Sequence, residues 1–436
     1  MIKRLPRLMT LVAAGLAAAC GIAACGSSSS SSSQTATNSG ATNAAATTGS
    51  TSLAGATTQF QKFVGGASGS ANASKSPITF GFVDDEGGFP SFPEDLVAAN
   101  AAVKFVNDEL GGIDGHPIKL KQCLVAGQES QGQSCAEQFL NDKSVVGNLE
   151  ISMPVGAASF HSTMAGRKPT IIGSPNAAAD GAAKNSYAIS SGIFGVHAFV
   201  TFAQKFLNAK SASLLFPGDD PAGQAAGKQA LQGLKAAGVK PTAAGYRSTS
   251  SSMLAPAAAA GAGRTDAVIG LFPSPPTCIS GAQALKTTAG NKPVVALGAC
   301  LAQPVQKQLG DFPQWFYQTV FENPGAPSLS PDVAAYAAVM GHYAGPTANL
   351  GGWAQAAFAS VLTAVKMGNE VGADKLSPQT LSAALQKFRG PAPMSPPNLH
   401  WGVIPGLPAV GAPTYRVYKY EGGGKFSDAT HGAWIG

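Results

Sequence analysis

Two successive series of alternating strand and helix patterns constrain the fold of this chain more than any other feature. The first opens with an apolar, β-prone segment at 78–83, which an acidic loop at 84–92 follows. It continues with a helical pattern that begins at Pro93 and resumes an extended pattern at 117–123. The second begins at Phe194 and alternates in the same way as far as Val320. Parallel sheets covered by helices on both faces produce such alternation, so the 436-residue chain is predicted to form two doubly wound, Rossmann-like α/β lobes.

The rest of the chain mixes structural types. Helical patterns cover 331–343, 353–371 and 377–388. The final segment, 413–426, has the β-prone composition and the glycine turn of a hairpin. We therefore expect extra helices and a short β tail after the two alternating series.

The first residues have the layout of a secretory signal. Lys3, Arg4 and Arg7 precede an apolar run at 8–24 that contains several alanines and glycines. Because no stop-transfer charges follow this run, a membrane-spanning helix is the weaker interpretation. We assign residues 1–24 to a signal peptide.

A cysteine at the end of this run indicates lipid attachment. Residues 22–26, Ile-Ala-Ala-Cys-Gly, resemble the bacterial lipobox, in which the cysteine (here Cys25) is lipidated and becomes the mature N-terminus. Ordinary cleavage near an Ala-x-Ala site is the alternative, but the serine run at 27–33 favours lipidation. Residues 25–76 are rich in Ser, Thr, Ala and Gly and almost uncharged, so we expect a disordered tether there. Phe60, Phe63 and Val64 interrupt this composition, and a short helical turn around them is the alternative.

Net charge and cysteine usage narrow the functional classes. Loss of the three basic signal residues lowers the formal charge from +6 to +3, and no cluster of Lys and Arg with interleaved aromatics occurs, so we expect no nucleic-acid partner. Cys20 belongs to the predicted signal peptide and Cys25 to the lipobox, so four cysteines remain. An exported protein meets an oxidising environment, in which these four can form two disulfides in any of three connectivities. Zinc is the rival interpretation, but the chain has no CxxC pair and only His116 lies nearby. We favour the sequence-local pairs Cys123–Cys135 and Cys278–Cys300.

Enzyme signatures are missing from the sequence. It contains no HExxH, GxSxG or Walker motif, and the segment 223–229 has the wrong spacing for a Walker motif and lacks its Ser or Thr. The six histidines are dispersed, and we interpret His161, on a predicted helix, as a surface or capping residue rather than a base. We therefore expect no catalysis, no cofactor and no metal.

The turn at 111–118, Gly-Gly-Ile-Asp-Gly-His-Pro-Ile, carries a family resemblance. Together with Val-Val-Gly at 145–147, Lys-Pro-Thr-Ile-Ile at 168–172 and the lipobox, it resembles the branched-chain amino-acid-binding family of type I periplasmic binding proteins. The resemblance covers about residues 77–436. It is strengthened by Cys123 and Cys135, which bracket the same loop in many Gram-positive members.

This resemblance implies a clamshell of two lobes joined by three crossovers. Ligand capture by such a protein takes place in the cleft between the lobes. The crossovers are expected near 190–192, 321–325 and 393–399. Lobe 1 would comprise 77–191 plus 324–395, and lobe 2 would comprise 192–322 plus 396–436.

The resemblance also implies where a ligand carboxylate would lie. In doubly wound sheets, ligands meet the carboxyl ends of strands and the free N–H groups of the following helices, which attract an anion. In the family, a serine after the third strand and a hydroxyl-bearing loop after the fourth hold the carboxylate; the matching residues here are Ser152, Ser174 and then Asn176. Helix capping is the alternative role for both serines. Glu150 would repel a carboxylate here unless it is turned away or paired.

The family binds the ligand's ammonium with an acidic residue and an aromatic residue of the second lobe. The matching loop at 272–277 has no carboxylate, and a desolvated ammonium needs an anion. For an amino-acid ligand, another acidic residue must therefore supply that charge. The candidate acids are Asp84, Asp85, Glu86 and Asp220, and the candidate stacking rings are Phe89, Phe92 and Phe272, for which loop-to-core packing is the alternative.

These features predict a receptor rather than an enzyme. We expect a monomeric, extracytoplasmic solute-binding protein of an ABC importer, held on the outer face of the bacterial cell membrane by a lipid on Cys25. It would bind an amino acid or a related small molecule and deliver it to the ABC permease and its ATPase subunits. A sensory receptor of the same fold, signalling to a membrane partner, is the alternative that the sequence leaves open.

Overall fold

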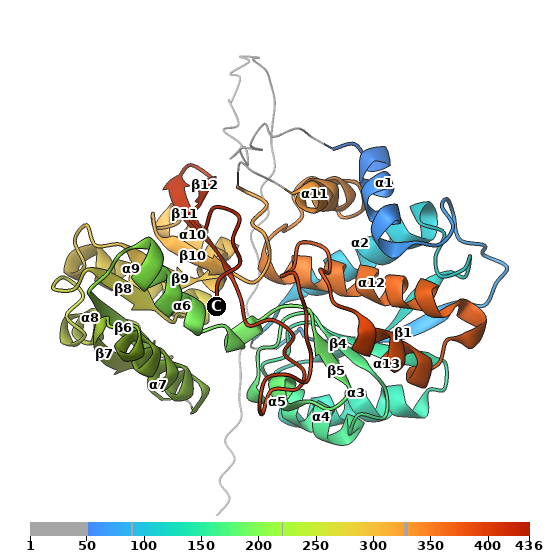
Figure 1. Ribbon diagram of the computed structural model, residues 1–436, viewed down its shortest axis with the longest axis horizontal. Coiled ribbons are helices and arrows are strands. Elements are labelled where there is room, and N and C mark those ends of the chain that lie inside the picture. Colours follow the sequence, from blue (N-terminus) through green and yellow to red (C-terminus); the bar gives the residue numbers. More distant parts are fainter. Residues whose placement is uncertain (1–50, 89, 220, 327–329) are drawn as a thin grey trace, which may run out of the picture. The chain divides into compact units, whose positions relative to one another are not determined.

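The first lobe is built on a five-stranded parallel sheet. The computed structural model describes residues 51–88, 90–219, 221–326 and 330–436 (Figure 1). The strands lie in the order β2-β1-β3-β4-β5. Because all of the pairs are parallel, the carboxyl ends of the strands meet at one edge of the sheet. The strands are β1 (Ile78–Asp85), β2 (Ile118–Val125), β3 (Val145–Glu150), β4 (Thr170–Ile172) and β5 (Ser186–Ala188).

Helices from two distant parts of the chain cover this sheet. The helices α2 and α12 lie side by side (Figure 1). The helix α13 contacts α12, and α11 contacts α2. The helices α3 and α4 pack together in a second core, with α5 beside α4. The bounds are α2 (Pro93–Glu109), α3 (Glu129–Asn141), α4 (Ala157–Met164), α5 (Ala178–Ala182), α11 (Pro331–Tyr343), α12 (Gly352–Val371), η4 (Ala373–Lys375) and α13 (Pro378–Lys387).

Alternation along β1 divides its side chains between these two cores. Phe80 and Phe82 belong to the core that contains α2 and α12, whereas Val83 belongs to the core that contains α3 and α4. Successive side chains of a strand point to opposite faces. Asp84 therefore follows Phe82 onto the α2 face, and Asp85 follows Val83 onto the α3–α4 face.

The predicted tether contains an ordered helix, so that prediction is wrong for its second half. The helix α1 (Leu53–Val64) begins after Ser52, whose side chain accepts a hydrogen bond from an N–H of the first turn. It contacts α11 and α12, and the Phe60 ring packs against the rings of Phe105 and Phe358. Apolar burial along this face outweighs the polar composition that suggested disorder. Residues 1–50, including the predicted signal peptide and Cys25, lie outside the described residues.

The second lobe is built on a seven-stranded mixed sheet in the order β12-β11-β10-β9-β8-β6-β7. The neighbouring strands β10, β9, β8, β6 and β7 are parallel to one another. The strands β11 and β12 form an antiparallel hairpin beside β10, which confirms the predicted β tail. Side chains of α8 and α9 pack in one core, and those of α6 and α7 in another. The elements are η1 (Gly192–Phe194), α6 (His197–Thr201), η2 (Phe202–Phe206), β6 (Ser211–Pro217), α7 (Pro221–Ala236), β7 (Lys240–Tyr246), α8 (Leu254–Ala259), β8 (Ala267–Gly270), α9 (Pro275–Thr288), β9 (Val294–Leu297), η3 (Gly298–Leu301), α10 (Gln303–Leu309), β10 (Phe316–Thr319), β11 (Arg416–Gly422) and β12 (Lys425–Asp428).

The third crossover between the two lobes lies later in the chain than 393–399, where we expected it. Leu399 and Ala412 are buried in the core of α2 and α12, whereas Tyr415 is buried in the core of the second sheet. The Ser191 hydroxyl donates a hydrogen bond to the Thr414 carbonyl at 2.8 Å, which joins the first crossover to the third. Residues 396–412 thus pack with the first sheet because their apolar side chains complete its core.

Both sequence-local disulfides are present. Cys123 of β2 is bonded to Cys135 of α3, and Cys278 of α9 is bonded to Cys300 of η3. Each bond joins a helix to a neighbouring element of its own lobe. None of the helices in the described part of the chain combines the length and the hydrophobicity that a membrane span needs.

Candidate functional site

The carboxyl edge of the first sheet brings the predicted binding serines to the same level. Glu150 of β3 pairs in register with Ile172 of β4, and Ser152 and Ser174 each lie two residues further along. The Ser174 N–H donates to the Ile151 carbonyl at 3.1 Å, so backbone pairing continues beyond the ends of the two strands. Two hydroxyl side chains therefore leave adjacent strands at one place on the edge.

Neither serine acts as a helix cap. The residues that precede α4 and α5 are Gly156 and Ala177. Ser152 is 0% exposed and Ser174 is 1% exposed. The Ser174 hydroxyl makes no hydrogen bond. The Ser152 hydroxyl lies beside the Asp95 carboxyl, but the two groups do not form a hydrogen bond of normal geometry. Asn176 is half-buried on the loop before α5.

Two buried carboxyls lie next to Ser152 on the α2 face. Asp84 and Asp95 are both 0% exposed, and Asp84 Oδ1 accepts a hydrogen bond from the Ser152 N–H at 3.2 Å. Burial raises the pKa of Asp84 well above its usual value, and the charge of Asp95 raises it further. Burial and the charge of Glu94 likewise raise the pKa of Asp95. The pair therefore keeps a proton at pH values where exposed carboxyls are ionised.

Replacing Asp84 by asparagine should make the protein's stability less dependent on pH. The raised pKa of the folded state means that the unfolded chain loses its proton first as the pH rises above about 4, so stability falls with rising pH until Asp84 also ionises. Asparagine keeps the acceptor for Ser152 and cannot ionise. Asp84→Asn should therefore be more stable than the wild type at pH 7, with a slope shallower by up to about 1.4 kcal/mol per pH unit.

Urea unfolding between pH 4 and 8 measures that slope. Asp108→Asn is the control, since Asp108 is exposed in the last turn of the same α2. Equal slopes for the wild type and Asp84→Asn would contradict a protonated Asp84.

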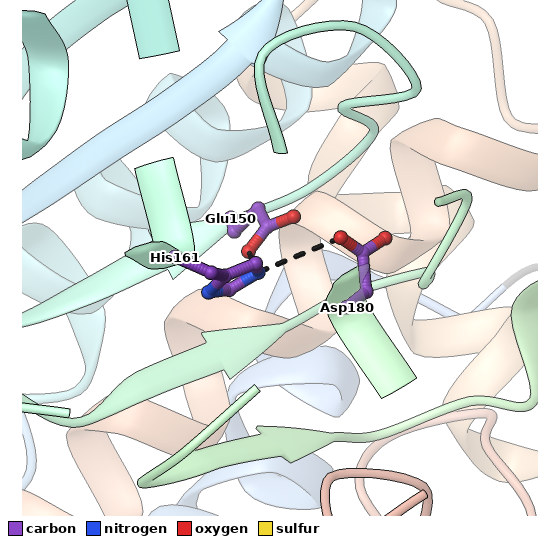
Figure 2. A group of neighbouring side chains, drawn as sticks. All are labelled: Glu150, His161 and Asp180. Atoms are coloured by element: carbon purple, nitrogen blue, oxygen red, sulfur yellow. Dashed lines mark ion pairs between the residues drawn. The ribbon is translucent and has the colours of Figure 1, made fainter. Parts of the chain in front are cut away.

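The α3–α4 face of the same edge holds a histidine between two carboxylates (Figure 2). His161 Nε2 of α4 lies 2.8 Å from Glu150 Oε2 at the end of β3 and 3.5 Å from Asp180 Oδ1 of α5. Their side chains are 8%, 1% and 0% exposed, respectively. The expectation of a surface or capping His161 is therefore wrong, because the helix α4 turns this side chain towards the sheet edge. Glu150 is paired, which is the condition set above for a carboxylate to bind nearby.

Electrostatics within this group follow from burial and opposite charge. Burial raises the pKa of Glu150 to about 7, although the His161 charge opposes that rise. Burial alone would lower the pKa of His161, but the charges of the neighbouring Glu150 and Asp180 raise it to about 10. His161 is therefore cationic at neutral pH when no other cation occupies the group.

Both aspartates of the predicted acidic loop belong to β1 and are buried. Asp85 Oδ2 accepts a hydrogen bond from the Val155 N–H at 3.0 Å, and burial raises the pKa of Asp85 to about 7. The strand extends two residues beyond its apolar segment, so these side chains support the loops of neighbouring strands. Asp84 and Asp85 therefore have no exposed surface for an ammonium, whereas Glu86, the next residue, is half-buried.

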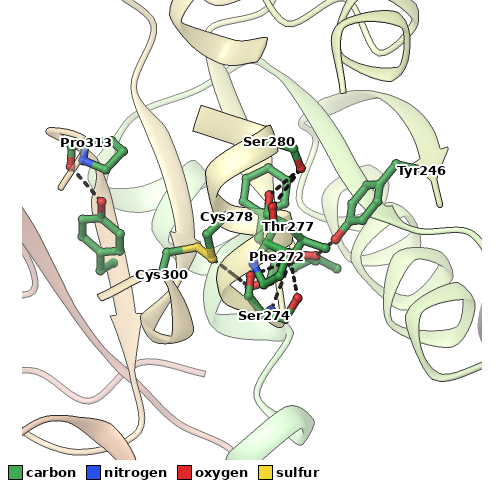
Figure 3. Close-up of a disulfide and its surroundings, with 11 residues drawn as sticks. Tyr246, Phe272, Ser274, Thr277, Cys278, Ser280, Cys300 and Pro313 are labelled. Atoms are coloured by element: carbon green, nitrogen blue, oxygen red, sulfur yellow. Dashed lines mark hydrogen bonds between the residues drawn. A yellow bond between two sulfur atoms is a disulfide. The ribbon is translucent and has the colours of Figure 1, made fainter. Parts of the chain in front are cut away.

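The candidates of the second lobe are placed less favourably. Phe272 is 0% exposed and packs between the rings of Tyr246 and Trp315, near the Cys278–Cys300 disulfide (Figure 3). Its packing alternative is therefore the one that the structure supports. In the first lobe, Phe92 is half-buried, and its ring packs against that of Trp353. Phe89 and Asp220 lie outside the described residues.

A hollow of about 400 Å³ lies elsewhere, on the second lobe. Its lining is rich in hydroxyl and amide side chains and shares no residue with the carboxyl edge of the first sheet. The lining includes Ser248, Ser250, Ile279, Ser280, Gln283 and Gln308. The buried hydroxyls and charged side chains described above therefore belong to the sheet edge and not to this hollow.

A family model described as "Periplasmic binding protein" matches residues 77–401. This match spans most of the described chain, including the whole first sheet and the five parallel strands of the second sheet. The chain belongs to the periplasmic binding protein family. The family is one of solute-binding proteins rather than of enzymes.

Solved structures share the fold of this binding protein. A leucine-binding protein of Thermotoga maritima has a TM-score of 0.66 at 11% identity, covering 82% of this chain and 98% of the other. A branched-chain amino acid transporter substrate-binding protein of Streptococcus pneumoniae, in complex with isoleucine, has a TM-score of 0.64 at 16% identity, covering 83% and 99%. An ABC transporter solute-binding protein of Rhodopseudomonas palustris, in complex with p-hydroxybenzoic acid, has a TM-score of 0.65 at 14% identity, covering 80% and 95%. No curated protein matches by sequence.

The binding protein is thus a type I, two-lobed α/β protein. Sequence reasoning located the edge of the first sheet because strand ends and following loops can be found from periodicity. It did not find Asp95, Asp180 or the pairing of His161, since these residues meet only through tertiary packing. Asp95 offers one signal, its place in the first turn of α2, but an acid at that position equally complements the positive end of the helix dipole.

Proposed function

We propose that this binding protein is the solute receptor of an ABC importer and captures a small organic solute at the carboxyl edge of lobe 1. The observation that carries the proposal is the Ser174 hydroxyl, buried, without a hydrogen bond, and level with Ser152 on the neighbouring strand. A buried hydroxyl without a partner is unfavourable by about 1–3 kcal/mol, which a ligand acceptor would recover. Opening of the lobes would admit the solute to this edge.

The solute that we propose carries a carboxylate, as an amino acid or an aromatic acid does. Leucine, isoleucine and p-hydroxybenzoic acid, named for the three proteins of the same fold, all have one. The acids beside the serines do not oppose this assignment. Burial raises the pKa values of Asp84 and Asp95, so this pair retains a proton, and Glu150 is paired with His161. A protonated carboxyl donates a hydrogen bond to an anion instead of repelling it.

Delivery follows from closure of the lobes on the solute. Contacts that the solute makes with both lobes favour the closed state, which the permease and its ATPase subunits would then recognise. We place the protein on the extracytoplasmic face of the membrane as a monomer, tethered by a lipid on Cys25. An amino-acid solute would further need an acid for its ammonium, for which Glu86 and Asp220 remain the candidates.

A thermal-shift screen of amino acids and of aromatic and aliphatic acids tests the receptor function. At least one solute should raise the melting temperature in a saturable way, because binding to the folded state stabilises it. A broad panel that gives no stabilisation of the folded protein would contradict the function.

Replacing Ser174 by alanine should weaken binding of that solute by about 5- to 150-fold, the equivalent of about 1–3 kcal/mol. The reason is that a solute oxygen would be left buried without its donor. Calorimetric titration of the wild type and the variant measures the difference. Ser134→Ala, the same change on the exposed side of α3, is the matched control and should leave the affinity unchanged. Equal affinities for the wild type and Ser174→Ala would remove Ser174 from the site.

A further inference from the structure

We propose that Glu150, His161 and Asp180 form a binding site for a divalent transition-metal cation, with Zn²⁺ as the best-fitting ion. The site would lie beside the edge that carries Ser152 and Ser174, and would not require a solute to be bound. Figure 2 shows the three side chains converging from β3, α4 and α5.

The donor atoms have the composition and spacing of a metal site. One imidazole nitrogen and two carboxylate oxygens lie within 4.8 Å of one another. His161 Nε2 is 2.8 Å from Glu150 Oε2 and 3.5 Å from Asp180 Oδ1. Tetrahedral Zn²⁺ with bonds near 2.0–2.1 Å places its donors about 3.3 Å apart. Zn²⁺ accepts nitrogen and carboxylate donors together, so small side-chain shifts would complete three-fold ligation.

Buried acceptor atoms without a hydrogen-bond partner favour a bound cation at this position. Asp180 Oδ2 accepts hydrogen bonds from the Asn176 and Ala177 N–H groups at 2.7 and 2.8 Å, which fixes the carboxylate with Oδ1 towards His161. Glu150 is fully buried, and its Oε1 has no hydrogen-bond partner. A buried carboxylate oxygen left in this way is costly unless a cation or a donor reaches it.

The charge balance of the surroundings also favours a divalent cation. Glu129 is a further acid on the same face, where its carboxylate accepts hydrogen bonds from the Gly156 and Ser159 N–H groups at the start of α4. Within the described ranges, no lysine or arginine forms an ion pair with any of these carboxylates. A protonated His161 supplies one positive charge, whereas a divalent cation with neutral His161 balances Glu150 and Asp180 completely.

A cation here would stiffen the solute-binding edge. It would join the end of β3 to α5, which follows the loop that leaves β4. Those connections carry Ser152 and Ser174, so the ion would fix the spacing of the two hydroxyls.

Metal titration of the full exported chain tests the proposal. The protein is treated with a chelator, dialysed, and titrated calorimetrically with Zn²⁺; Co²⁺ absorption then reports nitrogen and oxygen ligation directly. One Zn²⁺ per chain should bind and raise the melting temperature. Glu150→Gln and His161→Leu should each weaken binding by more than the roughly 100-fold that outer-shell changes reach.

Matched controls keep the outcome decisive. Asp180→Asn removes a ligand charge but keeps an acceptor for Asn176 and Ala177, so it should fold and still lose the cation. His342→Leu, on the exposed face of α11, should bind Zn²⁺ as the wild type does. Absence of saturable binding by the folded wild type would overturn the site and would show that His161 alone balances the two carboxylates. Unchanged binding by Asp180→Asn would also overturn it, because the cation would then bind elsewhere. Solute binding by such a protein would leave the receptor function intact.

Discussion

Replacing Phe60 by alanine is expected to lower the free energy of unfolding by about 3–5 kcal/mol. Phe60 is 0% exposed in α1, and its ring centroid lies 5.3 Å from that of Phe358 and 6.0 Å from that of Phe105. Truncation to alanine would remove these contacts and leave a cavity between α1, α2 and α12. Helices fixed elsewhere in the lobe cannot close such a cavity fully, which is why large-to-small changes in a core are costly.

Urea unfolding with circular dichroism measures this change from the midpoint and the slope. Lys62→Ala is the control, because Lys62 is exposed in the same helix and its replacement should change stability by no more than about 0.5 kcal/mol. A loss below about 1 kcal/mol for Phe60→Ala would mean that α1 is not part of the folded lobe. In that case the segment would be the tether that its composition suggests.

Replacing His161 by leucine should cost the metal-free protein about 3–5 kcal/mol at pH 7. Leucine fills a similar volume but leaves Glu150 and Asp180 buried without their cation. Removing one partner of a buried ion pair leaves an uncompensated charge in a medium that solvates it poorly. Part of this loss would be recovered by proton uptake, since the pKa of Glu150 is already raised by burial.

A double-mutant cycle separates the pairing from the packing. The double variant Glu150→Gln, His161→Leu should lose less stability than the sum of the two single changes. The reason is that His161→Leu removes the imidazole charge that Glu150→Gln leaves unpaired. The measurement is chemical unfolding in the presence of a chelator. Additive losses would contradict an ion pair between these side chains, and His342→Leu should change stability little.

Periodicity predicted most of the fold because each lobe has its own regular alternation of elements. The helix that begins at Pro93 and the hairpin near the end of the chain were both predicted from local pattern, and both are present. The two disulfides also followed a local rule, since each joins cysteines close in sequence. Such features depend on neighbours along the chain, which a sequence shows directly.

The full extent of the helix α1 was not predicted, because little in its local sequence indicates it. Its composition is mostly polar or small, which is typical of a tether, and its stability comes from a narrow apolar stripe. Ala56, Phe60 and Val64 recur at helical spacing on that stripe. Burial of so few side chains is enough only because α11 and α12, almost three hundred positions later, provide the surface.

The candidate site was predicted only in outline. Ser152 and Ser174 follow strand ends, and their common level on the edge follows from parallel pairing. The acids could not be assigned in the same way. Asp84 and Asp85 were expected in an open loop, but β1 continues through both and turns them into the two cores. His161 meets Glu150 and Asp180 only after α4 and α5 have packed against the sheet, and no motif marks that contact.

The central claim, that this protein is a receptor for a small solute, is tested most directly by native mass spectrometry. The folded wild type would be equilibrated with an extract of cellular metabolites and transferred gently into the spectrometer. The account predicts one added mass, at one solute per chain, that is lost from Ser174→Ala and kept by Ser134→Ala at the same extract concentration. Only the mass of the unbound wild type, in a sample whose thermal transition shows it to be folded, would contradict the account.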